Sequence, residues 1–189
     1  MHTTFDTLAA ALWAAFILSW ILAMAWISRA IKHTSWSSTV RDGVLYLISF
    51  GLLAAPASWT ARLWTVSEFL GWALIAIELL SFAFAGWARV HLGRLWSGRI
   101  TLRAGHKFVS SGPYRLVRHP IYTGFIAAAW SYGLITAAPT ALFGAALLTG
   151  QMAWKARREE SFLRAELGAA KYDAYAAKTP MLIPRFARR

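Results

Sequence analysis

The feature that most constrains this chain is a series of long apolar stretches separated by polar connections. Three stretches are about 20 residues long and run roughly over 8–27, 44–63 and 69–88. A helix of about 20 apolar residues is what crosses the hydrocarbon core of a bilayer. These three stretches therefore predict three transmembrane helices.

Two shorter apolar stretches follow, at about 121–138 and 140–154, and only Pro139 separates them. Proline ends a helix or begins a new one, so this pattern predicts a tight helical hairpin. The chain is thus predicted to be an all-α integral membrane protein with about five transmembrane helices. Its composition agrees, because 58% of its residues are hydrophobic and only 15% are charged. The N-terminus has neither a basic region nor a clear cleavage site, so no secretory signal peptide is predicted.

The basic residues test the predicted spans. Of the 20 Lys and Arg residues, 19 fall in the connections on one side of the five spans and in the C-terminal segment, and Arg62 alone falls on the other side. Because basic residues favour the cytoplasmic side, the N-terminus is predicted outside and the C-terminus in the cytoplasm. The net charge of +12 is then explained by contact with membrane lipids. No nucleic-acid-reading motif is present, and with no cysteine there is no thiolate metal site or nucleophile.

Two predicted cytoplasmic segments remain to carry chemistry, at about 89–120 and 155–189. Gly and Ser punctuate the first and predict turns. The second begins as a helix that continues out of the fifth span. We therefore divide the chain into three N-terminal spans, 1–88, and a core, 89–189, which contains the hairpin 120–154 and the C-terminal segment.

The core carries a recognisable pattern. It reads WSGRITLRAGHKFVSSGPYRLVRHPIYTG from residue 96, REESFLRAELG from residue 158 and TPMLIP from residue 179. This pattern resembles the isoprenylcysteine carboxyl methyltransferase family, which is grouped with membrane phospholipid methyltransferases. The resemblance implies an enzyme that uses S-adenosylmethionine. It also implies a cofactor pocket formed by the last two spans, the preceding loop and the C-terminal helical segment.

The resemblance also implies site residues. Arg118 and Glu160 are predicted to be catalytic. The predicted cofactor-binding residues are His106, Gly112, Pro113, Tyr114, Arg118, His119, Pro120, Tyr122, Glu159, Glu160 and Tyr172. No metal is predicted.

Acidic residues are scarce on the predicted cytoplasmic side, which directs attention to Glu159 and Glu160. One of them is predicted to bind the ribose or ammonium group of the cofactor. Adjacent residues on a helix point about 100° apart, so the two carboxylates are expected to have different partners. The alternative is a solvated helix face on which both pair with neighbouring basic side chains.

Arg118 and His119 directly precede Pro120, which suits the first turn of a helix. The start of this helix is predicted to offer backbone amides to an anion, with Arg118 as a bidentate clamp. The alternatives are that Arg118 reaches lipid headgroups and that His119 caps the helix. Tyr122 is expected along the ligand or in an interfacial aromatic belt. His106 is expected to position substrate or to lie in a solvated loop.

Glu78 stands near the middle of the third span, where a carboxylate indicates function or a buried hydrogen bond between helices. No site role is assigned to it.

Three functions remain open. The first is O-methylation of an isoprenylcysteine-like or other lipophilic acid, whose carboxylate is already ionised at neutral pH. The second is N-methylation of a phospholipid or other lipid, which requires a base. The third is a non-catalytic membrane protein whose basic loops contact lipid.

Overall fold

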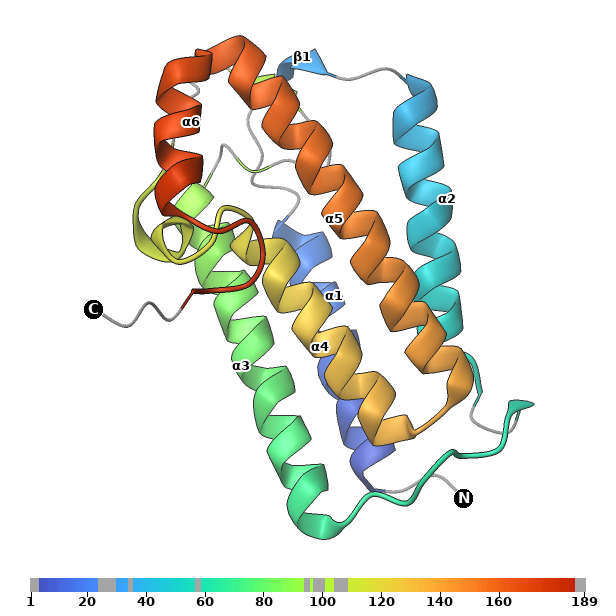
Figure 1. Ribbon diagram of the computed structural model, residues 1–189. Helices are drawn as coiled ribbons and strands as arrows, with labels where there is room; N and C mark the ends of the chain where they lie inside the picture. Colours follow the sequence, from blue (N-terminus) through green and yellow to red (C-terminus); the bar gives the residue numbers. More distant parts are fainter. Residues whose placement is uncertain are drawn as a thin grey trace.

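The computed structural model describes residues 4–23, 30–33, 36–56, 59–93, 96, 101–103 and 109–185. Five long helices run side by side and alternate in direction (Figure 1). They are α1 (Thr4–Ala23), α2 (Trp36–Leu53), α3 (Glu68–Leu92), α4 (Pro120–Thr136) and α5 (Pro139–Leu167). A short helix, α6 (Ala169–Lys178), follows α5 and packs at one end of the bundle. The predicted helical fold is confirmed for the described residues.

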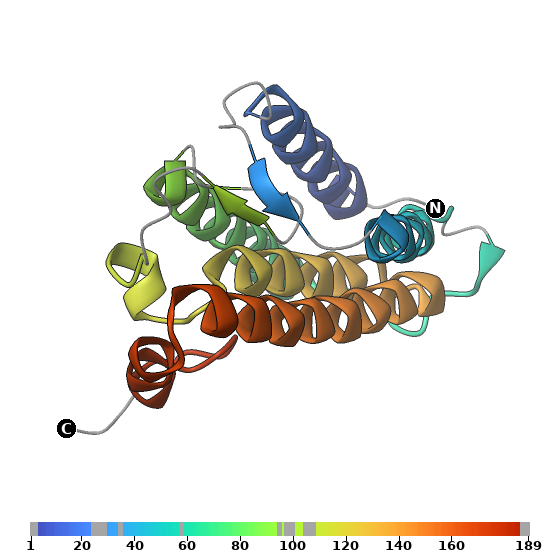
Figure 2. The ribbon, with the colours of Figure 1, turned by 90° about the horizontal axis from the view of Figure 1, so that it is seen from above.

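A small antiparallel sheet that the sequence did not predict lies at the same end as α6. Strand β1 (Ala30–His33) pairs with β2 (Thr101–Arg103), with Lys32 opposite Leu102 and His33 opposite Thr101. The register shifts between Ala30 and Lys32. The pair joins the α1–α2 connection to the α3–α4 connection across this end of the bundle (Figure 2).

Local chemistry explains the helix boundaries. Ser67 caps α3 by accepting a hydrogen bond from the Leu70 amide, and Glu68 and Arg89 complement the dipole at its two ends. Proline occupies the first turn of both α4 and α5, where its missing N–H is not needed. The predicted hairpin is present: Ala137, in the left-handed conformation, ends α4, and Pro139 begins α5.

Close packing of α3 against α4 forms the centre of the bundle. A Cβ at Gly124 would stand 2.6 Å from the carbonyl oxygen of Ser81 and 2.9 Å from the Cβ of Ala85. Further along the same contact, the Ser131 hydroxyl donates to the Leu74 carbonyl over 2.6 Å. Small residues thus let the two backbones approach, as they do between helices in membranes.

Aromatic rings fasten α1 to this centre. Phe16 stacks on Phe82 with 4.2 Å between ring centroids, and Trp13 meets Phe82 edge to face at 5.0 Å. Phe125 of α4 lies against both Trp13 and Phe16. Other large apolar side chains face outward, including Leu22, Leu47, Leu80 and Phe143. Such an exposed apolar surface on a helical bundle is typical of contact with lipid.

Two described helices, α1 and α3, are long and apolar enough to cross a membrane. The boundaries of α2 differ from the predicted span at 44–63, because the helix runs from Trp36 to Leu53. Arg41 and Asp42, expected in the connection, lie within the helix. Asp42 is buried there because α5 supplies its polar partners, Gln151 and Arg158.

Candidate functional site

A cluster of ionisable side chains lies where α4 begins and where α5 leaves the bundle. Glu160 accepts hydrogen bonds from Arg118 Nε to Oε1 at 2.7 Å and from Arg118 Nη2 to Oε2 at 3.1 Å. His119 Nε2 lies 3.0 Å from the same Oε1. Two segments about forty residues apart in sequence thus meet in one bidentate ion pair with a third, imidazole partner.

Glu159 points to other partners, as the helical angle between neighbouring residues predicted. The Tyr122 hydroxyl donates to Glu159 Oε2 over 2.9 Å, and His119 Nδ1 lies 3.9 Å from that oxygen. The rings of His119 and Tyr122 are parallel within 3°, with centroids 5.3 Å apart. The cluster therefore joins two carboxylates to a flat aromatic surface.

The C-terminal segment closes over this cluster. Arg118 Nη1 donates to the carbonyls of Ala176 and Thr179, at 3.1 and 2.6 Å. The backbone amides of Arg118 and His119 donate to the carbonyls of Pro180 and Met181, at 2.8 and 3.1 Å. These contacts fix the tail across the start of α4, where Figure 1 shows it passing in front of the helix.

This arrangement narrows the prediction that the start of α4 offers backbone amides to an anion. The amides of Arg118 and His119 are not available to an anion, because carbonyls of the tail already accept from them. The guanidinium of Arg118 is engaged as well, since Glu160 and two carbonyls share its donors. A ligand carboxylate would have to compete with Glu160 for this side chain.

Tyrosines brace the tail against the loop that precedes α4. This loop contains a short 3-10 helix, η3 (Gly112–Arg115). The Tyr175 hydroxyl donates to the Tyr114 carbonyl over 2.5 Å, and the Tyr114 hydroxyl reaches the Ala88 carbonyl at 3.5 Å. Tyr172 is buried, only 4% exposed, and meets Tyr175 edge to face.

Gly112 is required at its position. Its φ of +58° favours glycine, and a Cβ there would stand 2.8 Å from the His91 ring. Pro113, next to it, is fully buried. The Gly-Pro-Tyr motif thus sets the path of the loop against α3.

The electrostatics follow from this pairing. Burial raises the pKa of Glu160, but the hydrogen bonds and charges of His119 and Arg118 together outweigh it and leave the pKa below its ordinary value. Burial lowers the pKa of Arg118, and the hydrogen bond and charge of Glu160 more than reverse this effect. Burial raises the pKa of Tyr175 to about 12, so its hydroxyl stays protonated as a donor. Glu160 is therefore held as a carboxylate.

The structure brings most of the predicted site residues to this end of the bundle. Arg118, His119, Tyr122, Glu159 and Glu160 form one contact network. Tyr114 joins it through Tyr175 and the tail, and Tyr172 packs beside Tyr175. Pro120 is buried and begins α4, and Gly112 and Pro113 shape the loop without contacting a carboxylate in the described contacts. His106 lies outside the described residues.

Some residues of the network were missed. Lys155 is buried, 6% exposed, and its Nζ lies 5.2 and 6.0 Å from the ring centroids of Tyr46 and Tyr122. It stands one helical turn before Glu159, and that spacing was the available indication. Tyr175 and Thr123 were missed too; the Thr123 hydroxyl donates to the Leu182 carbonyl over 2.6 Å.

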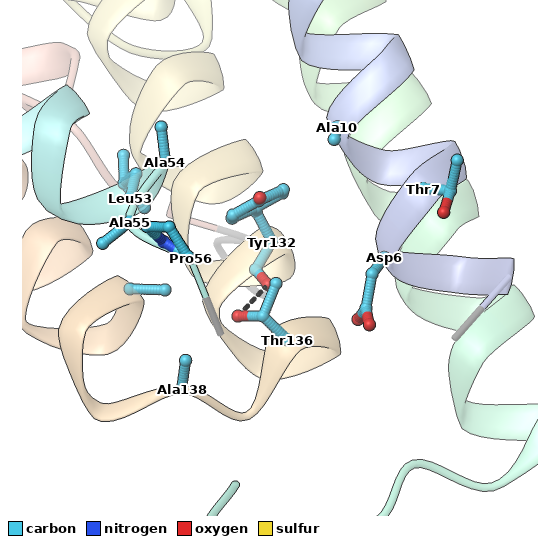
Figure 3. Close-up of a pocket in the computed structure, with 11 residues that line it drawn as sticks. Asp6, Thr7, Ala10, Leu53, Ala54, Ala55, Pro56, Tyr132, Thr136 and Ala138 are labelled. Carbon is cyan, nitrogen blue, oxygen red and sulfur yellow. Dashed lines mark hydrogen bonds between the residues drawn. The ribbon is translucent and has the colours of Figure 1, made fainter. Parts of the chain in front are cut away.

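Two other polar features lie away from the cluster. Glu78 is fully buried in α3, and its carboxylate oxygens have no hydrogen-bond partner among the described residues. At the opposite end of the bundle, a pocket of about 310 Å³ lies between α1, the end of α2 and the α4–α5 hairpin (Figure 3). Asp6 lines it and pairs with Arg62. Apolar and hydroxyl side chains form the rest of its wall.

The helical fold and the carboxylate network together indicate a class of protein. This is a helical membrane protein whose two C-terminal long helices and tail gather a carboxylate, arginine and histidine network at one end. A model of the isoprenylcysteine carboxyl methyltransferase family matches residues 73–165, which include Arg118, His119, Glu159 and Glu160. The chain is thus similar to this family over about half of its length.

The chain is also similar to several curated proteins. Methanethiol S-methyltransferase 2 of Bradyrhizobium diazoefficiens is 33% identical over 160 residues, which is 76% of this chain and 60% of the relative. A methanethiol S-methyltransferase of Mycobacterium tuberculosis is 34% identical over 164 residues, covering 78% and 64%. The nickel-cobalt-cadmium resistance protein NccN of Alcaligenes xylosoxydans xylosoxydans is 30% identical over 112 residues, covering 59% and 52%. The chain thus spans between about half and two thirds of the length of these relatives.

Proposed function

We propose that this protein is a membrane methyltransferase that uses S-adenosylmethionine, with its site at the cytoplasmic end of a five-span bundle. The contact network of Arg118, His119, Glu159 and Glu160 is the observation that carries the proposal. The match to the family and the similarity to methanethiol S-methyltransferases both support the reaction class.

The residues fit the proposed cofactor. This cofactor supplies an electrophilic methyl group on a sulfonium cation, together with an amino-acid head, ribose hydroxyls and adenine. Glu159 uses Oε2 toward Tyr122, which leaves Oε1 as an acceptor for an ammonium or a ribose hydroxyl. The stacked His119 and Tyr122 rings present a flat wall, and Tyr172 and Tyr175 add aromatic surface from the tail.

Arg118 has a different part in this proposal from the one that the sequence predicted. It orients Glu160 and holds the tail through the carbonyls of Ala176 and Thr179. The tail in turn excludes water from the start of α4. Desolvation and alignment are the main requirements for methyl transfer to an anionic acceptor.

The acceptor decides whether a base is needed. A lipophilic acid, the acceptor predicted from the sequence, is ionised at neutral pH and needs none. A small thiol, the acceptor suggested by the names of the methanethiol S-methyltransferases, is mostly protonated at neutral pH and benefits from a base. His119 suits this role through Nδ1, because Nε2 is engaged by Glu160 whereas Nδ1 lies 3.9 Å from Glu159, beyond hydrogen-bond distance. A lipid amine is the third acceptor to test.

Calorimetry tests cofactor binding first. Wild-type protein in detergent is expected to bind S-adenosylmethionine, and Glu159→Gln is expected to bind it about tenfold more weakly, as for one lost charged hydrogen bond. Absence of heat with the wild type would remove the proposal.

Methyl-labelled cofactor then identifies the acceptor in vesicles supplied with a prenylated acid, methanethiol or phosphatidylethanolamine. Label released by alkali indicates an ester, volatile label without alkali indicates a thioether, and stable label in lipid indicates N-methylation. Cofactor binding without transfer to any of the three would confine the protein to a binding role.

A further inference from the structure

Two arginines of different helices lie against one tryptophan ring, away from the carboxylate network. The guanidinium carbon of Arg41, on α2, lies 4.2 Å from the centroid of the Trp154 ring on α5. The guanidinium carbon of Arg158, one turn further along α5, lies 4.7 Å from the same centroid. We call these three residues the Arg–Trp–Arg cluster. The ring holds two cations within about 9 Å of each other, although like charges repel.

A single acidic residue partly compensates these cations. Asp42 lies 3.0 and 3.2 Å from Arg158 Nη1 through its two oxygens, and 3.9 Å from Arg41 Nε. Arg158 makes both contacts through Nη1, so Nε and Nη2 are not engaged by Asp42. With two guanidinium groups and one carboxylate, the cluster carries one net positive charge.

The cluster is open on its outer side. The Arg41 side chain is 51% exposed, Trp154 is 36% exposed and Arg158 is 22% exposed, whereas Asp42 beneath them is 12% exposed. The buried Asp42 carboxylate thus orients Arg158, and the Trp154 ring orients both Arg41 and Arg158. The cation edges remain accessible from the α2–α5 surface.

The position of the cluster indicates its ligand. Arg41 lies in the second turn of α2, and Arg158 directly precedes Glu159 on α5, so the cluster lies at the end of the bundle that holds the carboxylate network. If this end faces the cytoplasm, the cluster meets the headgroups of the inner leaflet, which carries anionic lipid. Trp and Arg are suited to this depth, since each has an apolar body and a polar edge.

We propose that the Arg–Trp–Arg cluster binds the phosphodiester of an anionic phospholipid. Guanidinium groups match the geometry of phosphate oxygens and bind them bidentately. Arg41 and Arg158 approach the phosphate from two helices, and Trp154 fixes both planes and packs against the glycerol and upper chain. The bound lipid joins α2 to α5, the helix that carries Glu159 and Glu160.

The test uses the full chain in a neutral detergent. Native mass spectrometry follows the titration of dioleoyl-phosphatidylglycerol onto the wild type and two matched variants, Arg41→Gln and Arg157→Gln. Both variants remove one exposed arginine, but Arg157 stands beside Arg158 and points about 100° around the helix from it. Arg41→Gln is expected to weaken lipid binding about tenfold, and Arg157→Gln less than twofold. Equal losses in the two variants would reduce the site to general electrostatic attraction and overturn the proposal.

A third variant, a second lipid and inorganic phosphate distinguish the possible ligands, and circular dichroism checks that the third variant is folded. Trp154→Leu keeps both charges but removes the ring, and it is expected to weaken the lipid several-fold while circular dichroism stays unchanged. Unchanged binding in this variant would contradict the geometry. Dioleoyl-phosphatidylcholine, whose choline offsets the phosphate charge, is expected to bind more weakly than phosphatidylglycerol. Inorganic phosphate that bound as tightly as phosphatidylglycerol, and lost affinity in Arg41→Gln, would assign the site to a free anion and reject the lipid.

Discussion

At the scale of single residues, Glu160 is the acidic centre of the site. Arg118 and His119 both contact it, and its side chain is 18% exposed. Removing one partner of such a partly buried pair leaves the other cation uncompensated. Changes at Glu160 should therefore act through Arg118, the tail and His119 together.

The substitution Glu160→Gln is expected to lower methyl transfer about 100-fold, because it removes the carboxylate that orients Arg118 and His119. Initial rates with labelled cofactor in reconstituted vesicles measure this change. Glu166→Gln, on the same helix outside the network, is the control and should keep near-normal rates. Equal rates in all three proteins would show that the network does not take part in the reaction.

The lowered pKa of Glu160 predicts a pH dependence of stability. Its pKa in the folded protein lies below the unfolded value of about 4.3, so its ion pair stabilises the fold above that pH. The contribution falls as pH drops through the folded pKa. The melting temperature of the wild type should exceed that of Glu160→Gln at pH 7, and the difference should shrink steadily below about pH 4. A difference that grew on acidification would contradict the assigned ion pair.

Residue patterns could predict that Arg118, His119, Glu159 and Glu160 converge, because scarce acidic residues and a proline-started helix are visible in the sequence. They could not predict that Arg118 binds Glu160 and tail carbonyls. Which donor meets which acceptor depends on how the tail folds back over about sixty residues, and no local spacing encodes that contact.

At the scale of helices, the contact between α3 and α4 sets the position of the site. Gly124 permits this contact, since the three atoms nearest to an added Cβ belong to the α3 backbone or to a short alanine side chain. None of these atoms can rotate away from an added methyl group. The helix pair must separate instead.

Gly124→Ala is expected to destabilise the protein by about 1 to 3 kcal/mol, as overpacking of a close contact usually does. Gly150→Ala is the matched control, because a Cβ there meets nothing within 4 Å. It should be neutral or stabilise its helix by up to about 1 kcal/mol. Thermal melting in detergent compares the two, and equal melting temperatures would show that α3 and α4 are less tightly packed than described.

Helix types and the hairpin at Pro139 were predictable, while the limits of α2 were not. The hydropathy of the sequence predicted this helix over 44–63, because Arg41 and Asp42 lower the mean hydropathy of any sequence window that contains them. In the structure they belong to the helix, since α5 provides Gln151 and Arg158 as partners for Asp42 and the Trp154 ring for Arg41. A partner from another part of the chain overrides the local pattern.

At the scale of the whole molecule, the charges and the helix directions agree. The α1–α2 and α3–α4 connections, α6 and the tail lie at one end of the bundle, and the α2–α3 connection and α4–α5 turn lie at the other (Figure 1). Among the basic residues of the described ranges, Arg62 alone belongs to the second group. This distribution is what the proposed orientation requires.

Cysteine labelling tests that orientation directly, because the chain has no cysteine of its own. Thr65→Cys lies exposed in the α2–α3 connection, and Ala170→Cys lies exposed on α6. An impermeant maleimide should label Thr65→Cys in intact cells and Ala170→Cys only after the membrane is opened. The reverse pattern would invert the proposed topology, and labelling of both in intact cells would contradict an odd number of spans between the two positions.

The carbonyls of Ala176, Thr179, Pro180 and Met181 that hold Arg118 and the start of α4 belong to the last part of the core that a ribosome makes. The five long helices are therefore synthesised before the groups that cover the site. A chain that ended before these carbonyls would contain Glu159 and Glu160. It would lack the carbonyl groups that accept hydrogen bonds from Arg118. Under the proposed function, synthesis of residues 176–181 is therefore the step that completes the site.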